Sequence, residues 1–254
     1  MEPVINLKDV SVRYRMPKER IPSLKEYAIR WLNGRRAEYA DFWALRDITL
    51  EVAKGEVLGI IGRNGAGKST LLKVIARVMK PTEGNVRVAG KVAPLLELGA
   101  GFDSDLTGRE NIYLNGAILG FSKREMDHKF EGIVDFAELW NFIDAPLRTY
   151  SAGMVARLGF AIATDINPDI LLVDEVLAVG DEGFQRKCAE RINRFMDDQI
   201  TIVIVSHDMD LIRTMCDRAV WLEHGLIQAM GEVNSTVSSY LNFLYAGESA
   251  HAKV

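Results

Sequence analysis

One short segment combines glycines, a lysine and two hydroxyl side chains at a spacing suited to binding phosphate. Residues 62–70 read Gly-Arg-Asn-Gly-Ala-Gly-Lys-Ser-Thr and match the pattern G-x-x-x-x-G-K-[ST]. An apolar run of strand length, residues 56–61, precedes the segment, and residues 71–79 carry apolar side chains at helical spacing. In that context the backbone N–H groups of the loop and the helix N-terminus bind phosphate. The sequence therefore predicts a nucleoside triphosphate site lined by Gly62, Asn64, Gly65, Ala66, Gly67, Lys68, Ser69 and Thr70.

Two side chains of this segment have separate roles in phosphate chemistry. We expect the Lys68 ammonium to reach the β- and γ-phosphates and to stabilise charge during phosphoryl transfer. We expect the Ser69 hydroxyl to bind Mg²⁺. A chance glycine turn is the alternative, and the strand and helix on either side of the segment disfavour it.

A second apolar run, residues 170–173, ends in two carboxylates, Asp174 and Glu175. In a parallel sheet this end of the strand lies at the same edge as the phosphate loop. Asp174 is suited to a Mg²⁺ site, and Glu175 is suited to orienting or deprotonating an attacking water. The alternative is an acidic pair that leaves the sheet into solvent.

A histidine, His207, follows a third apolar run, residues 201–205, and Ser206. A lone histidine at a strand end is often structural or exposed. Here it is expected at the sheet edge that also carries Lys68 and Asp174, which favours a catalytic contact with the γ-phosphate.

Composition limits the class of protein. The chain has 254 residues, 48% of them hydrophobic, which is sufficient for a substantial core. A formal net charge of -4 gives no support for nucleic-acid binding. The two cysteines, Cys188 and Cys216, have no histidine at zinc-ligand spacing, so we expect free thiols. No apolar stretch is long enough to span a bilayer, and no signal peptide is recognisable, so we expect a protein on the cytoplasmic side of a membrane.

The elements that must position these residues alternate between strand and helix. Continuous apolar strands alternating with helical patterns predict an α/β fold with a parallel sheet and ligands at the carboxyl ends of its strands. Strands are predicted at 4–15, 48–52, 56–61, 86–88, 91–98, 170–173 and 201–206, and helices at 71–79, 111–119, 123–143 and 150–166. The chain beyond Gly231 is weakly patterned, and we expect residues 236–254 to form a tail or linker.

Residues 16–42 interrupt the pattern between the first two strands. Ile21, Leu24, Ala28, Trp31 and Leu32 fall on one helical face, which predicts an inserted helix. The insert also carries several arginines and lysines beside its aromatic residues, a composition suited to a membrane–cytosol interface. The alternative is an amphipathic helix packed on the sheet edge.

Residues 150–154 precede a strongly apolar helix. Ser151 is a natural N-cap, and Ala152 and Gly153 leave the backbone open. Taken alone, this segment indicates only a capped helix.

Taken together, these motifs resemble the nucleotide-binding domain of ABC transporters from Val4 to about Gly231. The resemblance implies a P-loop NTPase (RecA-like) parallel-sheet core with an N-terminal antiparallel β portion, and a helical subdomain at about 100–165 within a domain spanning 1–235. It also implies a head-to-tail homodimer in which each ATP is completed in trans by Ser151, Ala152 and Gly153 of the other copy. Tyr14 stands where an aromatic ring stacks on adenine, and Trp43 is a competing candidate. Residues 178–181 stand where the family's D-loop falls.

The chain departs from the family pattern at two places. The usual Leu-Ser-Gly-Gly-Gln signature has Tyr150, Ala152 and Met154 at three of its five positions. The glutamine expected in the loop between the two lobes is missing, and Glu97 is the nearest candidate for its contact with Mg²⁺ or water. These departures bear on the affinity of closure more than on the type of reaction.

Four further segments resemble the ATPases of polysaccharide exporters, and among these they are most similar to the Wzt-type ATP-binding subunit. They are residues 148–154, 174–184, 95–102 and 106–111. The resemblance implies an ATPase that uses ATP and Mg²⁺ to move lipid-linked polysaccharide of the O-antigen type across the inner membrane. Its implied partners are a second copy and a polytopic permease that handles the glycan, with no nucleic acid. Its implied location is peripheral, on the cytoplasmic face of the membrane.

Three other functions are alternatives to polysaccharide export. An ABC transporter ATPase for another substrate, such as capsule, teichoic acid or a small molecule, has the same nucleotide motifs. A non-transport ABC ATPase that acts on ribosomes or DNA usually carries two nucleotide-binding domains or a long coiled-coil insert, and this sequence has neither. A P-loop kinase would leave Glu175 and residues 150–154 without a role.

Overall fold

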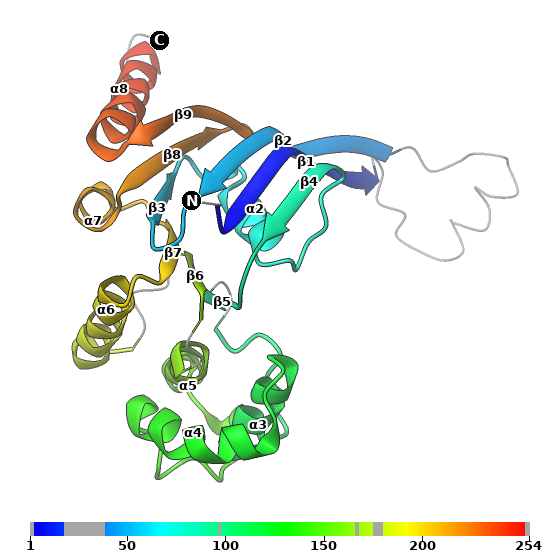
Figure 1. The fold of residues 1–254 in the computed structure, drawn as a ribbon, viewed down its shortest axis with the longest axis vertical. Coiled ribbons are helices and arrows are strands. Elements are labelled where there is room, and N and C mark those ends of the chain that lie inside the picture. The colour runs from blue at the N-terminus through cyan, green and yellow to red at the C-terminus, as the bar shows by residue number, and fades with distance from the viewer. Residues whose placement is uncertain (1–2, 18–38, 96–97, 166–167, 175–179, 252–254) are drawn as a thin grey trace, which may run out of the picture.

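The computed structural model describes residues 3–17, 39–95, 98–165, 168–174 and 180–251 (Figure 1). Its strands form two sheets. The strands are β1 (Ile5–Pro17), β2 (Tyr39–Val52), β3 (Val57–Ile61), β4 (Glu83–Val88), β5 (Val92–Leu95), β6 (Ile170–Asp174), β7 (Thr201–Val205), β8 (Arg218–Glu223) and β9 (Leu226–Glu232). The helices are α2 (Lys68–Ile75), α3 (Gly108–Ile118), α4 (Lys123–Ala137), α5 (Ala152–Asp165), α6 (Glu182–Asp197), α7 (Met209–Met215), α8 (Val233–His251) and the 3₁₀ helix η1 (Leu147–Thr149).

The larger sheet carries the predicted site residues at one edge. Its strand order is β5-β6-β7-β3-β8-β9, and all pairs are parallel except β8 with β9. Asp174 pairs with Val205, which also pairs with Ile60, so strands β6, β7 and β3 end at the same level. The predicted parallel α/β core is confirmed, and the loops after these three strands emerge side by side.

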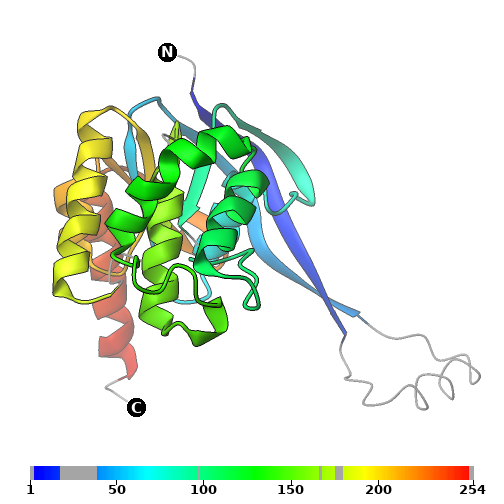
Figure 2. The same ribbon diagram turned by 90° about the horizontal axis from the view of Figure 1, so that it is seen from below.

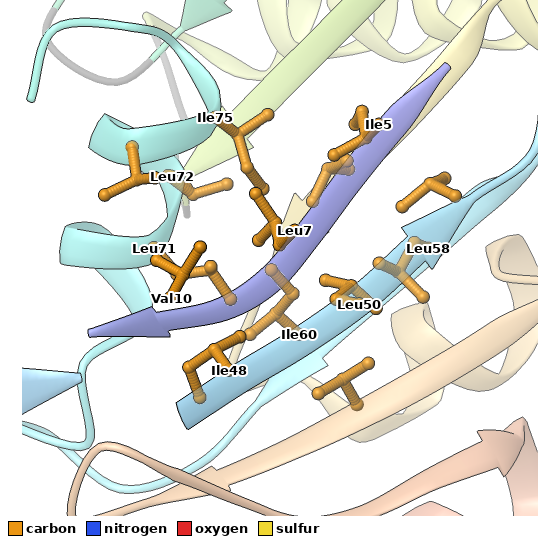
Figure 3. Packing of buried hydrophobic residues seen from close by; sticks show 14 of the residues in the cluster. Ile5, Leu7, Val10, Ile48, Leu50, Leu58, Ile60, Leu71, Leu72 and Ile75 are labelled. Atoms are coloured by element: carbon orange, nitrogen blue, oxygen red, sulfur yellow. The ribbon is translucent and has the colours of Figure 1, made fainter. Parts of the chain in front are cut away.

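The smaller sheet is antiparallel, in the order β2-β1-β4, and confirms the predicted N-terminal β portion. One hydrophobic core fills the space between this sheet, α2 and the near face of the larger sheet (Figure 3). Its members include Leu7 of β1, Leu50 of β2, Ile60 of β3 and Leu72 of α2, all at most 1% exposed. Because α2 packs in this core, the start of the helix is held beside the end of β3.

Helices α6, α7 and α8 cover the opposite face of the larger sheet (Figure 1). The last of them was not expected, because the sequence beyond Gly231 is weakly patterned. Val237 and Tyr240 of α8 are buried against this face, and the Tyr240 and Trp221 rings lie 5.7 Å apart. Apolar side chains also occur outside this buried face, with Phe243 and Tyr245 exposed, so α8 shows no clean division into an apolar and a polar face, and its pattern in the sequence was weak.

Helices α3, α4 and α5 form a lobe with its own core at the far side of the molecule from α8 (Figure 1). Capping boxes start α3 at Thr107 and α4 at Ser122. The helix predicted at 123–143 ends earlier, at Ala137, because Glu138 adopts the left-handed conformation with φ 59°. Turns then lead through η1 to α5.

The predicted insert has strands at both of its ends. Residues 16–17 and 39–42 belong to β1 and β2, which pair as far as Pro17 with Tyr39 and project away from the body (Figure 2). Cross-strand pairing therefore forms both ends of the insert. The apolar positions 21–32 lie outside the described residues. Across the described part of the chain, no helix is both long and apolar enough to cross a membrane.

Candidate nucleotide-binding site

The phosphate loop lies between β3 and α2 and is shaped by close backbone approach. Gly67, the N-cap of α2, has φ 108°, and a Cβ there would lie 2.6 Å from the carbonyl oxygen of Ala44. A Cβ on Gly62 would lie 2.1 Å from the carbonyl oxygen of Leu222. These two positions therefore require glycine. No side chain caps α2, so the N–H groups of its first turn are open to an anion.

Lys68 is held inside the loop by backbone carbonyls. The side chain is 8% exposed, and its Nζ donates to the carbonyl oxygens of Gly62 at 2.7 Å and Arg63 at 3.2 Å. Both acceptors belong to the loop that the lysine follows. The ammonium is thus fixed where phosphate oxygens would enter, and its buried charge is compensated by hydrogen bonds.

A cavity of about 430 Å³ opens over the loop. This volume falls within the usual range for small-molecule sites. Its lining brings together the two aromatic residues Tyr14 and Phe42, Ala44, the loop residues Asn64, Gly65, Ala66, Gly67, Lys68, Ser69 and Thr70, and Asp174. Segments far apart in the sequence therefore meet in one pocket, which holds every predicted residue of the phosphate loop except Gly62.

Two aromatic side chains form one wall of the cavity. Tyr14 of β1 and Phe42 of β2 are cross-strand partners, 37% and 49% exposed, and the Tyr14 hydroxyl lies 3.4 Å from the Met79 sulfur. Neighbouring side chains alternate along a strand, so Trp43 lies on the other face of β2. The Trp43 ring packs there beneath the guanidinium groups of Arg13 and Arg46, at 5.4 and 5.9 Å. Trp43 is outside the cavity lining, and Phe42 is a lining residue that the sequence did not identify.

The oxygen donors expected for Mg²⁺ meet in the same cavity. Ser69 and Asp174 both belong to its lining. Hard oxygen ligands of this kind fit Mg²⁺, which takes one or two protein ligands and completes its shell with water and phosphate. Within the described ranges no group of three or more His, Cys, Asp or Glu residues is arranged to hold a metal by itself. Glu97 and Glu175 lie outside the described residues.

His207 lies beyond the end of β7, between the strands that lead to Asp174 and to the phosphate loop. Its side chain is exposed and does not line the cavity. The preceding Ser206 is buried, and its Oγ accepts the backbone N–H of Asp208 at 3.0 Å. The turn after β7 is thus fixed at the end of the strand that lies between β6 and β3.

Ser151, Ala152 and Gly153 lie in the helical lobe and contribute nothing to the cavity lining. The Ser151 Oγ accepts the backbone N–H of Met154 at 3.2 Å, as expected of an N-cap. Ser151 and Ala152 are exposed. A Cβ on Gly153 would meet only the Ser151 Oγ, at 3.8 Å, and the backbone there is not left-handed. Nothing within the described part of the chain therefore requires glycine at this position.

Ion pairs that the sequence did not indicate connect this lobe to the start of α6. Arg157 of α5 pairs with Glu138 at 3.2 Å and with Asp181, and Lys187 of α6 also pairs with Glu138. The pKa of the Glu138 carboxyl is lowered, chiefly by its hydrogen bond from Lys187. The pKa of Asp181 is lowered chiefly because its carboxylate accepts the Phe184 backbone N–H at the N-cap of α6. Such long-range pairs follow no sequence period, so only the fold reveals them.

Comparison with known proteins identifies the family. The family model described as "ABC transporter" matches residues 45–178, which include the phosphate loop, Ser151–Gly153 and Asp174. The O-antigen export system ATP-binding protein RfbB of Klebsiella pneumoniae is 45% identical over 94% of this chain and 98% of its own. The chain belongs to the ABC transporter family. As an ABC transporter ATPase it binds and hydrolyses ATP.

Other relatives and solved structures agree with this assignment. The teichoic acids export ATP-binding protein TagH of Shouchella clausii is 40% identical to this ABC transporter ATPase over 96% of the chain and 67% of TagH. The dimeric post-hydrolysis structure of the ATP-binding cassette MJ0796, bound to ADP and Pi, superposes with a TM-score of 0.70. The two chains are 24% identical, and the match covers 90% of this chain and 98% of that chain. The structural likeness confirms the predicted ABC cassette fold.

Proposed function

We propose that this ABC transporter ATPase is the motor subunit of an exporter that moves lipid-linked polysaccharide of the O-antigen type across the inner membrane. The observation that carries the proposal is the 45% identity to the Klebsiella pneumoniae O-antigen export protein over 98% of that protein. A Myxococcus xanthus protein of the same name is 43% identical over 98% of this chain. The teichoic-acid export protein from Shouchella clausii, at 40% identity, supports the wider class of polymer exporters.

In this proposal the cavity binds ATP in one orientation. The adenine lies against Tyr14 and Phe42, and the phosphates lie over residues 62–70, with Lys68 at the β- and γ-phosphates. Ser69 and Asp174, with Glu97, hold Mg²⁺, which when bound neutralises phosphate charge. The two aromatic rings and the loop are therefore assigned to opposite ends of the same ligand.

We further propose that two copies close head to tail, so that Ser151, Ala152 and Gly153 of each copy complete the site of the other. Two features support this: Ser151 and Ala152 are exposed, and no neighbour among the described residues explains the glycine at position 153. Small residues at a helix N-terminus suit close approach to the γ-phosphate of a second copy. The solved relative MJ0796 is itself dimeric.

Hydrolysis in this arrangement is an in-line displacement. A water oxygen forms a bond to the γ-phosphorus while the bond to the bridging oxygen of ADP breaks, which leaves ADP and inorganic phosphate. Glu175 orients the water or takes its proton, and His207 contacts the γ-phosphate. Lys68 and the Ser151 of the other copy stabilise the developing charge.

The proposed partner is a polytopic permease that handles the glycan, with this subunit peripheral on the cytoplasmic face of the membrane. The β1–β2 extension projects from the body as far as the pair Pro17 and Tyr39, so it is the segment proposed to face the permease or lipid headgroups (Figure 2). In this proposal the ATP-binding domain, expected at 1–235, extends into α8, because Val237 and Tyr240 are buried against the larger sheet, and the chain beyond them is its tail.

Affinity purification of Glu175→Gln from detergent-solubilised native membranes in Mg-ATP tests the function. Slow hydrolysis should keep the closed complex together, and Mg-ADP provides the matched control with the same variant. We expect a multi-span membrane protein and lipid-linked glycan to co-elute, identified by mass spectrometry. A permease carrying another cargo would contradict the O-antigen assignment, and ribosomal or nucleic-acid partners without a membrane protein would contradict the transport role.

A further inference from the structure

Tyr150 replaces the leucine of the usual signature segment. Hydrogen bonds hold both its side-chain hydroxyl and its backbone N–H. The residue is 9% exposed, and its hydroxyl donates to the carbonyl oxygen of Phe142 at 2.7 Å. Its backbone N–H donates to the carbonyl oxygen of Leu147 at 2.9 Å. Burial raises the pKa of the phenol, which keeps it protonated and able to donate. A leucine at this position would pack but could not make the bond to Phe142.

Gly108, at the start of α3, leaves room for that hydroxyl. A Cβ on Gly108 would lie 2.3 Å from the Tyr150 oxygen and 3.0 Å from the Ile143 Cδ1. The backbone of Gly108 is not left-handed, so its conformation alone would accept any residue. The absence of a side chain at 108 is therefore explained by the packing of the tyrosine.

The surroundings of Gly108 and Tyr150 form one hydrogen-bonded block. The Arg109 N–H donates to the Ile143 carbonyl oxygen at 2.9 Å, and the Leu147 N–H donates to that of Leu106, also at 2.9 Å. The Asn111 side chain, fully buried, accepts the Asp103 N–H and donates to the carbonyl oxygens of Asp103, Leu106 and Thr107. The segment that enters the lobe from the larger sheet and the turn that precedes Ser151 are thus held together.

We propose that Tyr150 is a positioning residue that, through its hydroxyl and the space left by Gly108, sets Ser151–Gly153 for closure on the ATP of a second copy. The proposal rests on the proposed head-to-tail site. Tyr150 itself lies buried behind the exposed Ser151, so it acts through the placement of that segment. The prediction is specific: removal of the hydroxyl should weaken closure of the dimer and leave the open chain's affinity for ATP unchanged.

The test uses the full-length chain with Glu175→Gln, which accumulates the closed dimer. Tyr150→Phe is added, and sedimentation velocity measures the dimer fraction as Mg-ATP is titrated. We expect the ATP concentration at half-dimerisation to rise by up to about 10-fold, because one hydrogen bond within the chain sets the upper bound of the effect. Binding of a fluorescent ATP analogue at protein concentrations where the chain is monomeric should not change.

A second pair of variants separates this role from a general loss of stability. Gly108→Ala places a methyl group against the hydroxyl and should weaken dimerisation more than Tyr150→Phe does. Combining Gly108→Ala with Tyr150→Phe should restore part of that loss, because the closest clash is removed. Gly132→Ala is the matched control in the same lobe, since its Cβ would have only the Asp165 Oδ1 within 4 Å, at 3.9 Å.

Each outcome decides between the alternatives. An unchanged half-dimerisation concentration for Tyr150→Phe would overturn the positioning role, as would a thermal midpoint that falls while dimerisation is unaffected. Additive effects of Gly108→Ala and Tyr150→Phe would also overturn it, because no shared contact would then exist. If the Glu175→Gln parent formed no dimer with Mg-ATP, the proposed head-to-tail site itself would be contradicted, and the positioning role with it.

Discussion

The edge of the larger sheet and the N-terminal end of α5 both carry groups suited to binding phosphate. The two regions differ in whether those groups line a cavity within one chain. At the sheet edge, phosphate loop, carboxylate and aromatic wall line one cavity within a single chain. At α5, Ser151 and Ala152 are exposed outside that cavity, and the Ser151 hydroxyl caps the start of the helix. The first region has its lining residues together within one chain, whereas the second has no partner surface among the described residues. In the proposed head-to-tail dimer, turnover depends on assembly, which suits a subunit that must couple hydrolysis to movement.

The largest expected effect tests the phosphate loop at the edge of the larger sheet. Lys68→Ala removes the buried ammonium that Gly62 and Arg63 hold over the phosphate position. We expect ATPase activity to fall at least ~100-fold, the usual consequence of losing one preorganised charge at a reacting phosphate. Steady-state phosphate release measures the effect, and Lys80→Ala, at an exposed position just beyond α2, is the control expected to keep full activity. Activity of Lys68→Ala near that of the control would remove the lysine from the site.

A smaller effect is expected at the aromatic wall of the same cavity. Tyr14→Ala and Phe42→Ala should each raise the Kd for ATP by about 5–10-fold, since stacking of a base on an aromatic ring contributes about 1–3 kcal/mol. Trp43→Ala, next in sequence but on the opposite face of β2, should leave the Kd unchanged. Isothermal titration with the three variants compares them directly. A weakened Trp43→Ala with an unaffected Phe42→Ala would reverse the assignment of the wall.

The smallest effect concerns the connection between the two regions. Glu138 ends α4, and its ion pairs with Arg157 and Lys187 link the helical lobe to α6. Because half of the Glu138 side chain is exposed, Glu138→Gln should lower Tm by only about 1–3 °C at neutral pH. Its folded-state pKa lies below the ordinary 4.5, so this contribution is present above pH 4.5 and is lost as the pH falls through the folded-state pKa.

The measurement is thermal unfolding of the chain and of Glu138→Gln between neutral pH and about pH 4, where the difference in Tm should begin to shrink. Glu131→Gln, exposed on the same helix, is the control, with no expected difference at either end of this range. A difference that grew toward acid pH would show that the ion pairs do not depress this pKa.

The two regions also differ in how far the sequence could predict them. The phosphate loop and Asp174 follow from local patterns, because a strand, a loop and a helix occur in continuous stretches of chain. Phe42 could not be found in this way. Its place in the cavity depends on the pairing of β1 with β2, which residues 18–38 separate in the sequence, and this pairing fixes which side of β2 faces the cavity. Docking of α8 by Val237 and Tyr240, and the contact of Tyr150 with Gly108, likewise depend on residues that only the tertiary fold brings together.

The family resemblance was confirmed by the comparisons, and it is what gave Ser151–Gly153 a role beyond capping a helix. The local pattern of that segment indicates only an N-cap, which the structure also contains. A residue that acts on a second copy leaves no trace in the packing of its own chain. The open space around Gly153 is consistent with such a role, and direct measurement on the assembled protein must test it.

Disulfide trapping tests the divided site most directly. Asn64→Cys and Ser151→Cys are introduced together into the Glu175→Gln chain, which is oxidised with copper phenanthroline with and without Mg-ATP. The native thiols give little background, because burial raises the pKa of Cys188 and of Cys216 to about 12. We predict a covalent dimer that forms only with Mg-ATP and only when both introduced cysteines are present. A chain that binds ATP but forms no such dimer, or forms it equally without nucleotide, would contradict a site completed by a second copy.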